Sequence, residues 1–582
     1  MKTIYPIKAF SLVLLFYAAS LRAQDTKNDN LNRELSLERE YDPSVQDASK
    51  VNTLPVIKDP AITKHAIDYA FLSSPADPQR EIGKISAGMF KTEREYDKRR
   101  GYLNGGIGNH WNINGDLGYQ PLHSDKDLLN VYLTHRSSNS SVRYMDGFLK
   151  DEQVKARTND NIAGLDFSHR FTNATLKLNA QYGYSTFNYY GLPTPSHYPL
   201  PEMPHNDMET NQVNNLFVIG TGVNASDGAA TDFYGDLSFT RLSFKYGMDA
   251  NSDGIGENTF DLKLGISSPL RGQHRLGIDT RFGYFNYSKT EDIKVFQNFL
   301  TGKISPYYLL ENEQWKFKIG LNILFHTGDS AKFFASPDLA LELNLGLRTI
   351  LYVNAGGSMK PNSLYGLSRE NRYTAPIFAT RPSRTMLDAI LGLKSGVAPG
   401  FWFNLFGGYK YTADDYFFIP EMSFFGFGNL SRTLPLNSQR YYAGLELKYA
   451  HLKLFEIVMK CVYNHWSVEN KHIPEQTHTD IIPEWKPYGR PRLEAGAGFL
   501  LRPMEKMTFS LDYYLASGRR TIVNWNEKMK DISELNLLTS YTINKTFMPY
   551  IRLSNMLFQR YEVYYGYPLQ EATIMLGINI NF

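Results

Sequence analysis

Hydrophobic and polar residues alternate with a period of two along many stretches of this 582-residue chain. In residues 315–325 (WKFKIGLNILF) every odd position is apolar, whereas the even positions are mostly lysine, glycine and asparagine. The same alternation appears at 174–184, 339–347 and 493–499, and again in the last residues, 572–582. Successive side chains of a β-strand point to opposite faces, so each stretch predicts a strand with one apolar face and one polar or small face.

About 22 such strands can be placed between residue 101 and the end of the chain. Short connections, such as those near residues 172, 271, 398 and 544, take turns with long ones. The long connections are expected at 138–159, 188–211, 361–383, 419–435, 469–489 and 519–531. Short turns on one side and long loops on the other are typical of outer-membrane barrels. We therefore predict an all-β fold, an antiparallel transmembrane β-barrel over residues 101–582, with long extracellular loops and short periplasmic turns.

The N-terminus has the layout of a secretory signal. Lys2 and Lys8 precede a short apolar run, and Ala23 offers a small residue for cleavage, so residues 1–23 are predicted to be a signal peptide. No later apolar run reaches about 18 residues, the length that a transmembrane helix needs. An exported chain of this kind, with 39 tyrosines and 44 glycines, fits a barrel in contact with outer-membrane lipid. We expect it in the cell outer membrane of a Gram-negative bacterium.

Charge, cysteine content and motifs argue against other classes of protein. The formal net charge of +3 is close to balance, which argues against a nucleic-acid partner. Cys461 is the only cysteine, so no disulfide can form within the chain. The sequence has no GxSxG, HExxH or P-loop motif, and we expect no enzymatic activity.

The C-terminal stretch NMLFQRYEVYYGYPLQEATIMLGINI NF (555–582) resembles the closing hairpin of TonB-dependent receptors, and 383–418 is similar to one of their internal hairpins. The resemblance covers the architecture of residues 101–582. In that family a terminal aromatic residue is read by the barrel-assembly machinery, so the resemblance implies that Phe582 is an assembly signal. We expect the apolar face of residues 574–582 to meet lipid, and the edge of this strand to pair with the strand near residue 101.

TonB-dependent receptors carry a globular plug ahead of the barrel, and residues 24–100 are too short to form one. That stretch is polar and punctuated by prolines, which predicts an extended periplasmic segment, with a part inside the lumen as one interpretation. Its amino-acid sequence resembles that of a group of plugless receptor-like barrels. Because a barrel of about 22 strands would leak solutes if left open, something must fill its lumen. The candidates are residues 24–100, in-folded outer loops, mutually neutralising charges on the wall, or a separate protein.

A candidate metal site lies in the stretch DANSDGIGE, which is expected in a long outer loop. Asp249, Asn251 and Asp253 at a spacing of two supply the oxygen ligands of a Ca²⁺ loop, with Glu257 as a further ligand. The pattern breaks at the twelfth position, where a bidentate acid is expected and Phe260 stands instead. The alternative is an Asx-rich turn, which uses the same residues for its own hydrogen bonds. No other cofactor is expected.

A cluster of phenylalanines is expected to be exposed near the outer rim of the barrel. Aromatic side chains in that position would contact a ligand or a partner protein. The alternative is the aromatic girdle that barrels carry at the membrane interface. The residues are Phe417, Phe418, Phe424, Phe425 and Phe427.

Two functions fit these expectations. The first is solute binding or uptake across the outer membrane by a receptor-like barrel. The second is a non-transporting accessory or structural subunit of an envelope assembly or secretion complex, which docks a periplasmic or outer-membrane partner through residues 24–100. The first is favoured by architecture alone, which is an argument from fold analogy.

Overall fold

The computed structural model describes residues 99–582 with gaps, and the expected signal peptide and almost all of the segment 24–100 lie outside the described residues. The gaps are residue 148, 193–210, 227–230, 248–253, residue 271, 289–295, 329–330, residue 347, 376–379, 421–429 and 471–483. No helix within the described ranges is long and apolar enough to cross a membrane.

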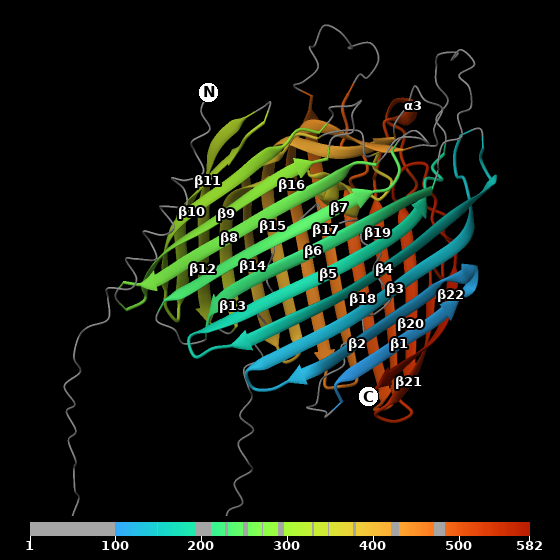
Figure 1. The fold of residues 1–582 in the computed structure, drawn as a ribbon, viewed down its shortest axis with the longest axis horizontal. Helices are drawn as coiled ribbons and strands as arrows, with labels where there is room; N and C mark the ends of the chain where they lie inside the picture. Colours follow the sequence, from blue (N-terminus) through green and yellow to red (C-terminus); the bar gives the residue numbers. More distant parts are fainter. Residues whose placement is uncertain are drawn as a thin grey trace, which may run out of the picture. The chain divides into compact units, whose positions relative to one another are not determined.

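The described residues form a sheet of 22 antiparallel strands (Figure 1). The first eleven are β1 (Gly101–Gly108), β2 (Ile113–His123), β3 (Asp127–Arg143), β4 (Gln153–Arg170), β5 (Ala174–Asn188), β6 (Asn211–Ala225), β7 (Asp232–Phe244), β8 (Gly256–Pro269), β9 (His274–Tyr287), β10 (Phe299–Glu311) and β11 (Trp315–His326). The others are β12 (Lys332–Gly346), β13 (Thr349–Lys360), β14 (Ser383–Ala398), β15 (Phe401–Pro420), β16 (Ser431–His451), β17 (Phe455–Glu469), β18 (Leu493–Met504), β19 (Met507–Ser517), β20 (Ile532–Tyr541), β21 (Phe547–Ser554) and β22 (Thr573–Asn581). Among the described residues, three short helices interrupt the connections, η1 (Asn109–Trp111), α2 (Leu364–Glu370) and α3 (Val523–Asn526).

The sheet closes into a barrel because β1 pairs with β22. Leu103 lies opposite Ile580 in this pair, and the backbone N–H of Phe582 donates to the carbonyl of Gly101 over 2.9 Å. Every other strand pairs with its neighbours in the sequence, so the strand order around the barrel is the order in the chain. The predicted fold class, the strand number and the pairing of the last strand with the strand near residue 101 are confirmed.

The two faces of the wall differ as the alternation predicts. On β22, Leu576 and Ile578 face outward and are exposed, and the terminal ring of Phe582 stacks on Tyr119 of β2 at the same outer surface, with 6.2 Å between ring centroids. The lumen face carries charges in pairs. Examples are Lys318–Asp338 at 2.7 Å, Arg281–Asp261 at 2.7 Å and Lys460–Glu446 at 2.8 Å. The expected mutual neutralisation of the wall is confirmed for these residues.

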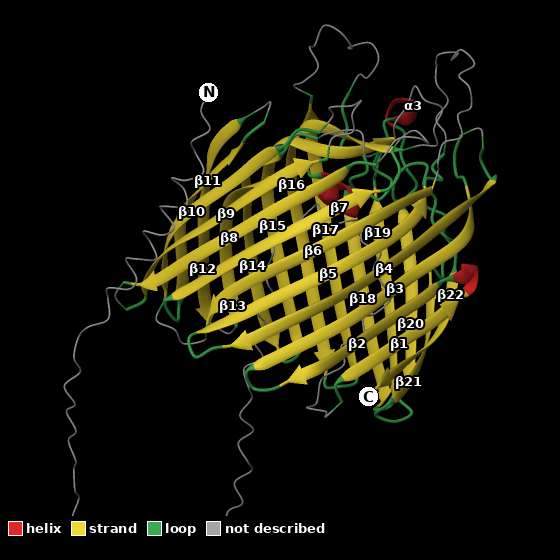
Figure 2. Cartoon of the chain, viewed as in Figure 1, coloured by secondary structure: helices red, strands yellow, loops and turns green. Residues whose placement is uncertain are grey.

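Several strands run further than their alternation predicts. The long connection expected at 138–159 is mostly strand, because β3 continues to Arg143 and β4 begins at Gln153. Residues 137–141 (SSNSS) are polar on both faces, so the hydrophobicity pattern does not indicate a strand there. Beyond the lipid both faces of a strand meet water or loops, so the backbone pairing persists without alternation. Figure 2 shows the strands continuing to the end of the barrel where the long loops gather.

Candidate functional site

The connection between β13 and β14 begins with a segment that folds into the barrel. This part, residues 361–375, is called the lumen segment below. Its helix α2 begins after Ser363, whose hydroxyl accepts a hydrogen bond from the Gly366 N–H over 3.2 Å and caps the helix. Leu364 and Leu367 are buried. Leu364 packs against a cluster of inward-facing residues from β7, β9 and the position before β8, namely Leu242, Phe244, Ile255, Phe285 and Tyr287.

The lumen segment spans the interior of the barrel. At its start the backbone N–H of Tyr365 donates to Glu257 of β8 over 3.2 Å. At its C-terminal part Arg372 forms an ion pair with Asp160 of β4 at 3.0 Å, while Glu370 accepts a hydrogen bond from Tyr416 of β15. In a closed barrel of 22 strands, β4 and β15 stand half-way round from one another. Contacts to both therefore place this segment across the lumen.

Polar side chains hold the middle of the lumen segment. The carboxylate of Glu370 pairs with Lys360 at 3.0 Å. The backbone carbonyl oxygen of Glu370 accepts a hydrogen bond from the hydroxyl of Tyr564 over 2.7 Å. Arg372 and Asp160 remain 37% and 29% exposed, so water in the lumen screens their attraction. The middle of the segment is thus held by a few discrete polar contacts, of which the Arg372–Asp160 pair is partly exposed to water.

Aromatic stacking holds the end of the lumen segment at the outer mouth. The ring of Tyr373 stacks on Tyr567, with 3.8 Å between centroids and 15° between planes, and meets Tyr190 edge-on. The N–H of Ala375 then donates to the carbonyl of Ser431 at the start of β16 over 2.8 Å. Tyr190, Tyr373, Ala375 and Tyr567 belong to one buried cluster that also contains Leu430 and joins the lumen segment to three outer loops.

The connection between β21 and β22, residues 555–572, covers the lumen segment and is called the closing loop. It is anchored by Arg519, which is fully buried and donates to the carbonyls of Val563 and Lys530 over 3.0 and 2.8 Å. Burial lowers the pKa of this guanidinium to about 10, so it keeps its charge near neutral pH. Tyr561 adds a hydrogen bond to Glu534 over 2.6 Å. The closing loop is therefore fixed more firmly than the lumen segment.

Glu562 is an unusual carboxyl group in the closing loop. It is buried, and its Oε2 accepts from the Gly566 N–H over 3.0 Å. Burial raises its pKa from 4.5 to about 7; the hydrogen bond from Gly566 opposes the shift and the negative charge of Asp146 adds to it. The closing loop thus contains a group that changes its charge near neutral pH.

A cavity of about 890 Å³ lies between the lumen segment, the inner wall of β3 to β6 and the closing loop. Its wall residues supply hydroxyls and amides, the carboxylate of Asp160 and several apolar side chains, and α2 adds further charged side chains. The residues that line it include Ser138, Thr158, Gln181, Asn214, Tyr365 and Arg369. A volume of this size is within the range of ligand sites, about 300–1,000 Å³.

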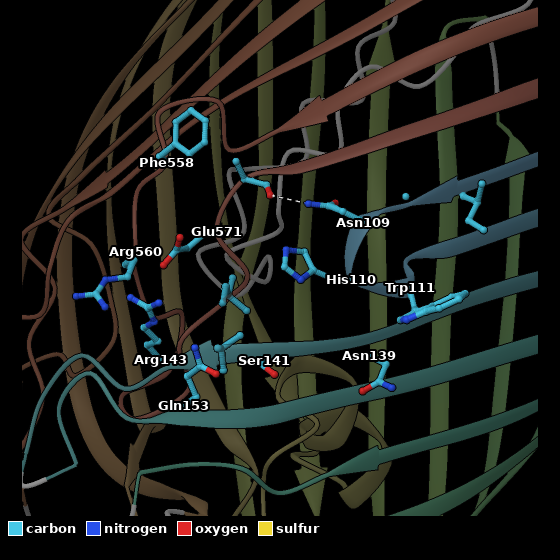
Figure 3. Close-up of a pocket in the computed structure, with 15 residues that line it drawn as sticks. Asn109, His110, Trp111, Asn139, Ser141, Arg143, Gln153, Phe558, Arg560 and Glu571 are labelled. Atoms are coloured by element: carbon cyan, nitrogen blue, oxygen red, sulfur yellow. Dashed lines mark hydrogen bonds between the residues drawn. The ribbon is translucent and has the colours of Figure 1, made fainter.

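A second cavity, of about 760 Å³, lies at the outer rim beside the β1–β22 seam (Figure 3). There Asn109 donates to the carbonyl of Ala572 over 3.2 Å, the bond drawn dashed in the figure. Its charges are mixed, because Arg143, Arg560 and Glu571 all line it, and Arg560 pairs with Asp151 at 2.8 Å. Trp111 and Phe558 line this cavity and are 70% and 72% exposed. Such aromatic residues are typical of the membrane interface.

The structure tests the predicted metal ligands only in part. Asp249, Asn251 and Asp253 lie outside the described residues. Glu257 is buried on the lumen face of β8, where it accepts hydrogen bonds from the Thr259 hydroxyl over 2.9 Å and from the lumen segment. Within the described ranges no group of three or more His, Cys, Asp or Glu residues could hold a metal ion. The Ca²⁺ loop stays a prediction.

The predicted exposure of the phenylalanine cluster at the outer rim is wrong for Phe417. Phe417 is fully buried, in a cluster with Ile419, Leu436 and Tyr488, because its side chain meets an inward-folded outer loop and not solvent. Phe418 packs edge-on against Tyr564 of the closing loop, with 5.5 Å between centroids. Phe424, Phe425 and Phe427 lie outside the described residues. A contact of this cluster with a ligand or partner stays a prediction.

The residues of the lumen segment were not singled out from the sequence. In-folded outer loops were one of the candidates for filling the lumen, but nothing in the alternation selects this loop. A signal does exist, because Ser363 precedes the stretch LYGLSRE with leucines three residues apart. A capped amphipathic turn of helix inside a long barrel loop indicates packing against protein.

No protein-family model and no curated protein matches this sequence. Solved structures do match in fold. The FrpB iron transporter from Neisseria meningitidis superposes with a TM-score of 0.61 at 10% identity, covering 84% of this chain and 82% of that one. The ferric-catecholate import receptor Fiu from E. coli K12 gives 0.59 at 10% identity, with 83% and 82% covered. The siderophore receptor PiuA from Acinetobacter baumannii gives 0.59 at 10% identity, with 84% and 82% covered.

These similarities define the class of the protein. It is a closed antiparallel β-barrel whose fold is that of the barrels of TonB-dependent receptors, as the closing hairpin predicted, and this fold is consistent with the expected place in the outer membrane. Identities near one residue in ten establish the fold, and function has to be argued from this chain's own residues.

Proposed function

We propose that this barrel binds a solute and takes it up across the outer membrane, with the lumen segment as its gate. The observation that carries the proposal is the path of the lumen segment from β15 to β4, across a lumen that wall side chains alone would leave open. The superposed structures include an iron transporter and two import or siderophore receptors, which supports transport as the class of function.

A gate has to be released at a moderate free-energy cost, and the contacts of the lumen segment fit that requirement. Its helix α2 has 7 residues, so it is unstable without tertiary packing. The packing of α2 depends mainly on the two buried leucines, and the ion pair from Arg372 to Asp160 is partly exposed to water. A solute that competes for Arg372 or displaces α2 would shift the segment toward an open state.

Swelling of proteoliposomes in neutral sugars tests this proposal. Wild type is compared with a variant in which residues 364–374 are replaced by a glycine–serine linker of equal length, and with a form lacking residues 24–100. We expect slow swelling for wild type and fast swelling for the linker variant, because β13 and β14 keep their pairing while the lumen loses its obstruction. A matched control replaces the exposed periplasmic turn residues Leu452 and Lys453 by glycine and serine and should resemble wild type.

The accessory-subunit function makes the opposite prediction. If swelling stays slow in all three forms, the barrel is an anchor and not a pathway. Co-purification of a stable periplasmic or outer-membrane partner, lost when residues 24–100 are removed, would then support docking of that partner. Swelling that rises only when residues 24–100 are removed would assign the gate to that segment and contradict the role of the lumen segment.

A further inference from the structure

We propose that the 890 Å³ cavity beside the lumen segment takes a carboxylated sugar, such as a short acidic oligosaccharide. This proposal rests on the proposed uptake function and names the chemical class of its solute. Three features of the cavity lead to it, namely a wall in which Asp160 is the one charged residue, a single cation without an ion pair among the described residues, and aromatic side chains.

Apart from Asp160, which pairs with Arg372, the polar side chains that the strands present to the cavity are uncharged. Strands β3 to β6 contribute Ser138, Thr158, Gln181 and Asn214. The Oδ1 atom of Asn214 is buried and has no hydrogen-bond partner among the described residues. An acceptor left in this state is unfavourable by about 1–3 kcal/mol, which a ligand donor would relieve. Amides and hydroxyls serve both as donors and as acceptors, as recognition of a polyhydroxylated molecule requires.

The charges of the cavity leave one cation free. Glu370 pairs with Lys360, and Asp160 pairs with Arg372. Arg369 lines the same cavity from the last turn of α2, is exposed, and has no ion pair within the described part of the chain. Its planar guanidinium matches a carboxylate by two parallel hydrogen bonds.

The same charges select against other ligands. A phosphate dianion would meet the carboxylates of Asp160 and Glu370 with only one free guanidinium to balance it. A metal cation or a polyamine would find both carboxylates already paired. A monocarboxylate with many hydroxyls satisfies the wall and Arg369 together.

Aromatic side chains complete the match to a sugar. Tyr365 of α2 and Tyr564 of the closing loop line the cavity on the side away from the strands. An aromatic ring offers a flat apolar surface together with a hydroxyl, which suits the C–H face and the rim of a pyranose. Tyr365 belongs to the gate, and Tyr564 belongs to the loop that contacts it, so a bound sugar would contact the gate directly.

Isothermal titration calorimetry on the full-length protein in detergent tests the ligand class, with trigalacturonate, neutral galactotriose and inorganic phosphate as probes. We expect trigalacturonate to bind at least 10-fold more tightly than galactotriose, and phosphate not to bind. Arg369→Gln should abolish the preference for the acidic sugar, whereas Arg369→Lys should keep part of it. Arg170→Gln, an exposed arginine at the periplasmic end of β4, is the matched control and should bind as wild type does. Asn214→Leu should weaken both sugars equally.

Equal affinity for the acidic and neutral sugars, binding of phosphate in place of sugar, or no binding at all would each overturn the proposal. Trigalacturonate binding that survives Arg369→Gln undiminished would overturn the assigned site. The swelling assay does not depend on the ligand, so fast swelling of the linker variant without sugar binding would remove the ligand class and leave the uptake function standing.

Discussion

Leu364 is the side chain that most directly fixes the gate to the wall. It is almost completely buried among Leu242, Phe244, Phe285 and Tyr287, and Leu364→Ala would leave a cavity there. Truncation of a buried leucine costs about 2–5 kcal/mol. If that loss falls on the docked state alone, the undocked population of α2 rises by about 30-fold to a few thousand-fold.

Hydrogen exchange of the α2 amides measures this change. The N–H groups of Leu367 and Asn371 donate to the carbonyls of Ser363 and Leu367 over 2.9 and 2.8 Å, and a helix of this length loses both bonds once it undocks. In Leu364→Ala we expect the exchange of these two amides to accelerate by about 30-fold to a few thousand-fold, while the amides of the wall strands keep their protection. Leu452→Ala, at an 88% exposed turn position, is the control. Unchanged exchange in Leu364→Ala would refute the idea that this packing holds the gate.

Three further predictions concern the contacts of the outer mouth and the end of the chain. The raised pKa of Glu562 means that its contribution to the stability of the closing loop is fully present below pH 4.5 and falls by up to about 3 kcal/mol as pH rises through about 7; the protection of the loop's amides, relative to their intrinsic exchange rates, should therefore fall between pH 5 and pH 8, and Glu562→Gln should remove that fall. A double-mutant cycle of Arg372→Ala and Asp160→Ala, read by exchange of the α2 amides, should give a coupling of about 0.5–1 kcal/mol that shrinks at high salt; zero coupling at low salt would mean that the ion pair does not hold the gate. Deletion of Phe582 should lower the amount of heat-modifiable barrel in outer-membrane fractions several-fold relative to Tyr541→Phe, and equal amounts would remove its role as an assembly signal.

The barrel was predictable from the sequence because lipid imposes a strict period of two on its wall. Residues 574–582 show the point, since their apolar face follows from the alternation and their pairing with the first strand follows from closure of the predicted barrel. Strand ends beyond the lipid were less predictable, because residues such as Ser138 and Ser140 belong to strands without any alternation.

The gate could not be predicted in the same way, because its contacts are non-local. Arg372 and Asp160 are 212 residues apart in the sequence, and each by itself is an ordinary charged residue of a loop or a wall. Only the closure of the barrel brings β4 opposite β15, so the path of the lumen segment depends on the whole fold. Phe417 illustrates the converse, since an aromatic residue near a rim is exposed or buried according to whether another loop covers it.

Single-channel recording in a planar bilayer tests the central claim most directly, that the lumen segment closes an otherwise conducting barrel. Wild type and the variant with residues 364–374 replaced by a glycine–serine linker are recorded under the same voltage and salt. The account predicts a closed or rarely open wild type and a variant with long-lived openings of large, uniform conductance. A variant as silent as wild type would contradict it, and so would a wild type that already conducts at the level of the variant.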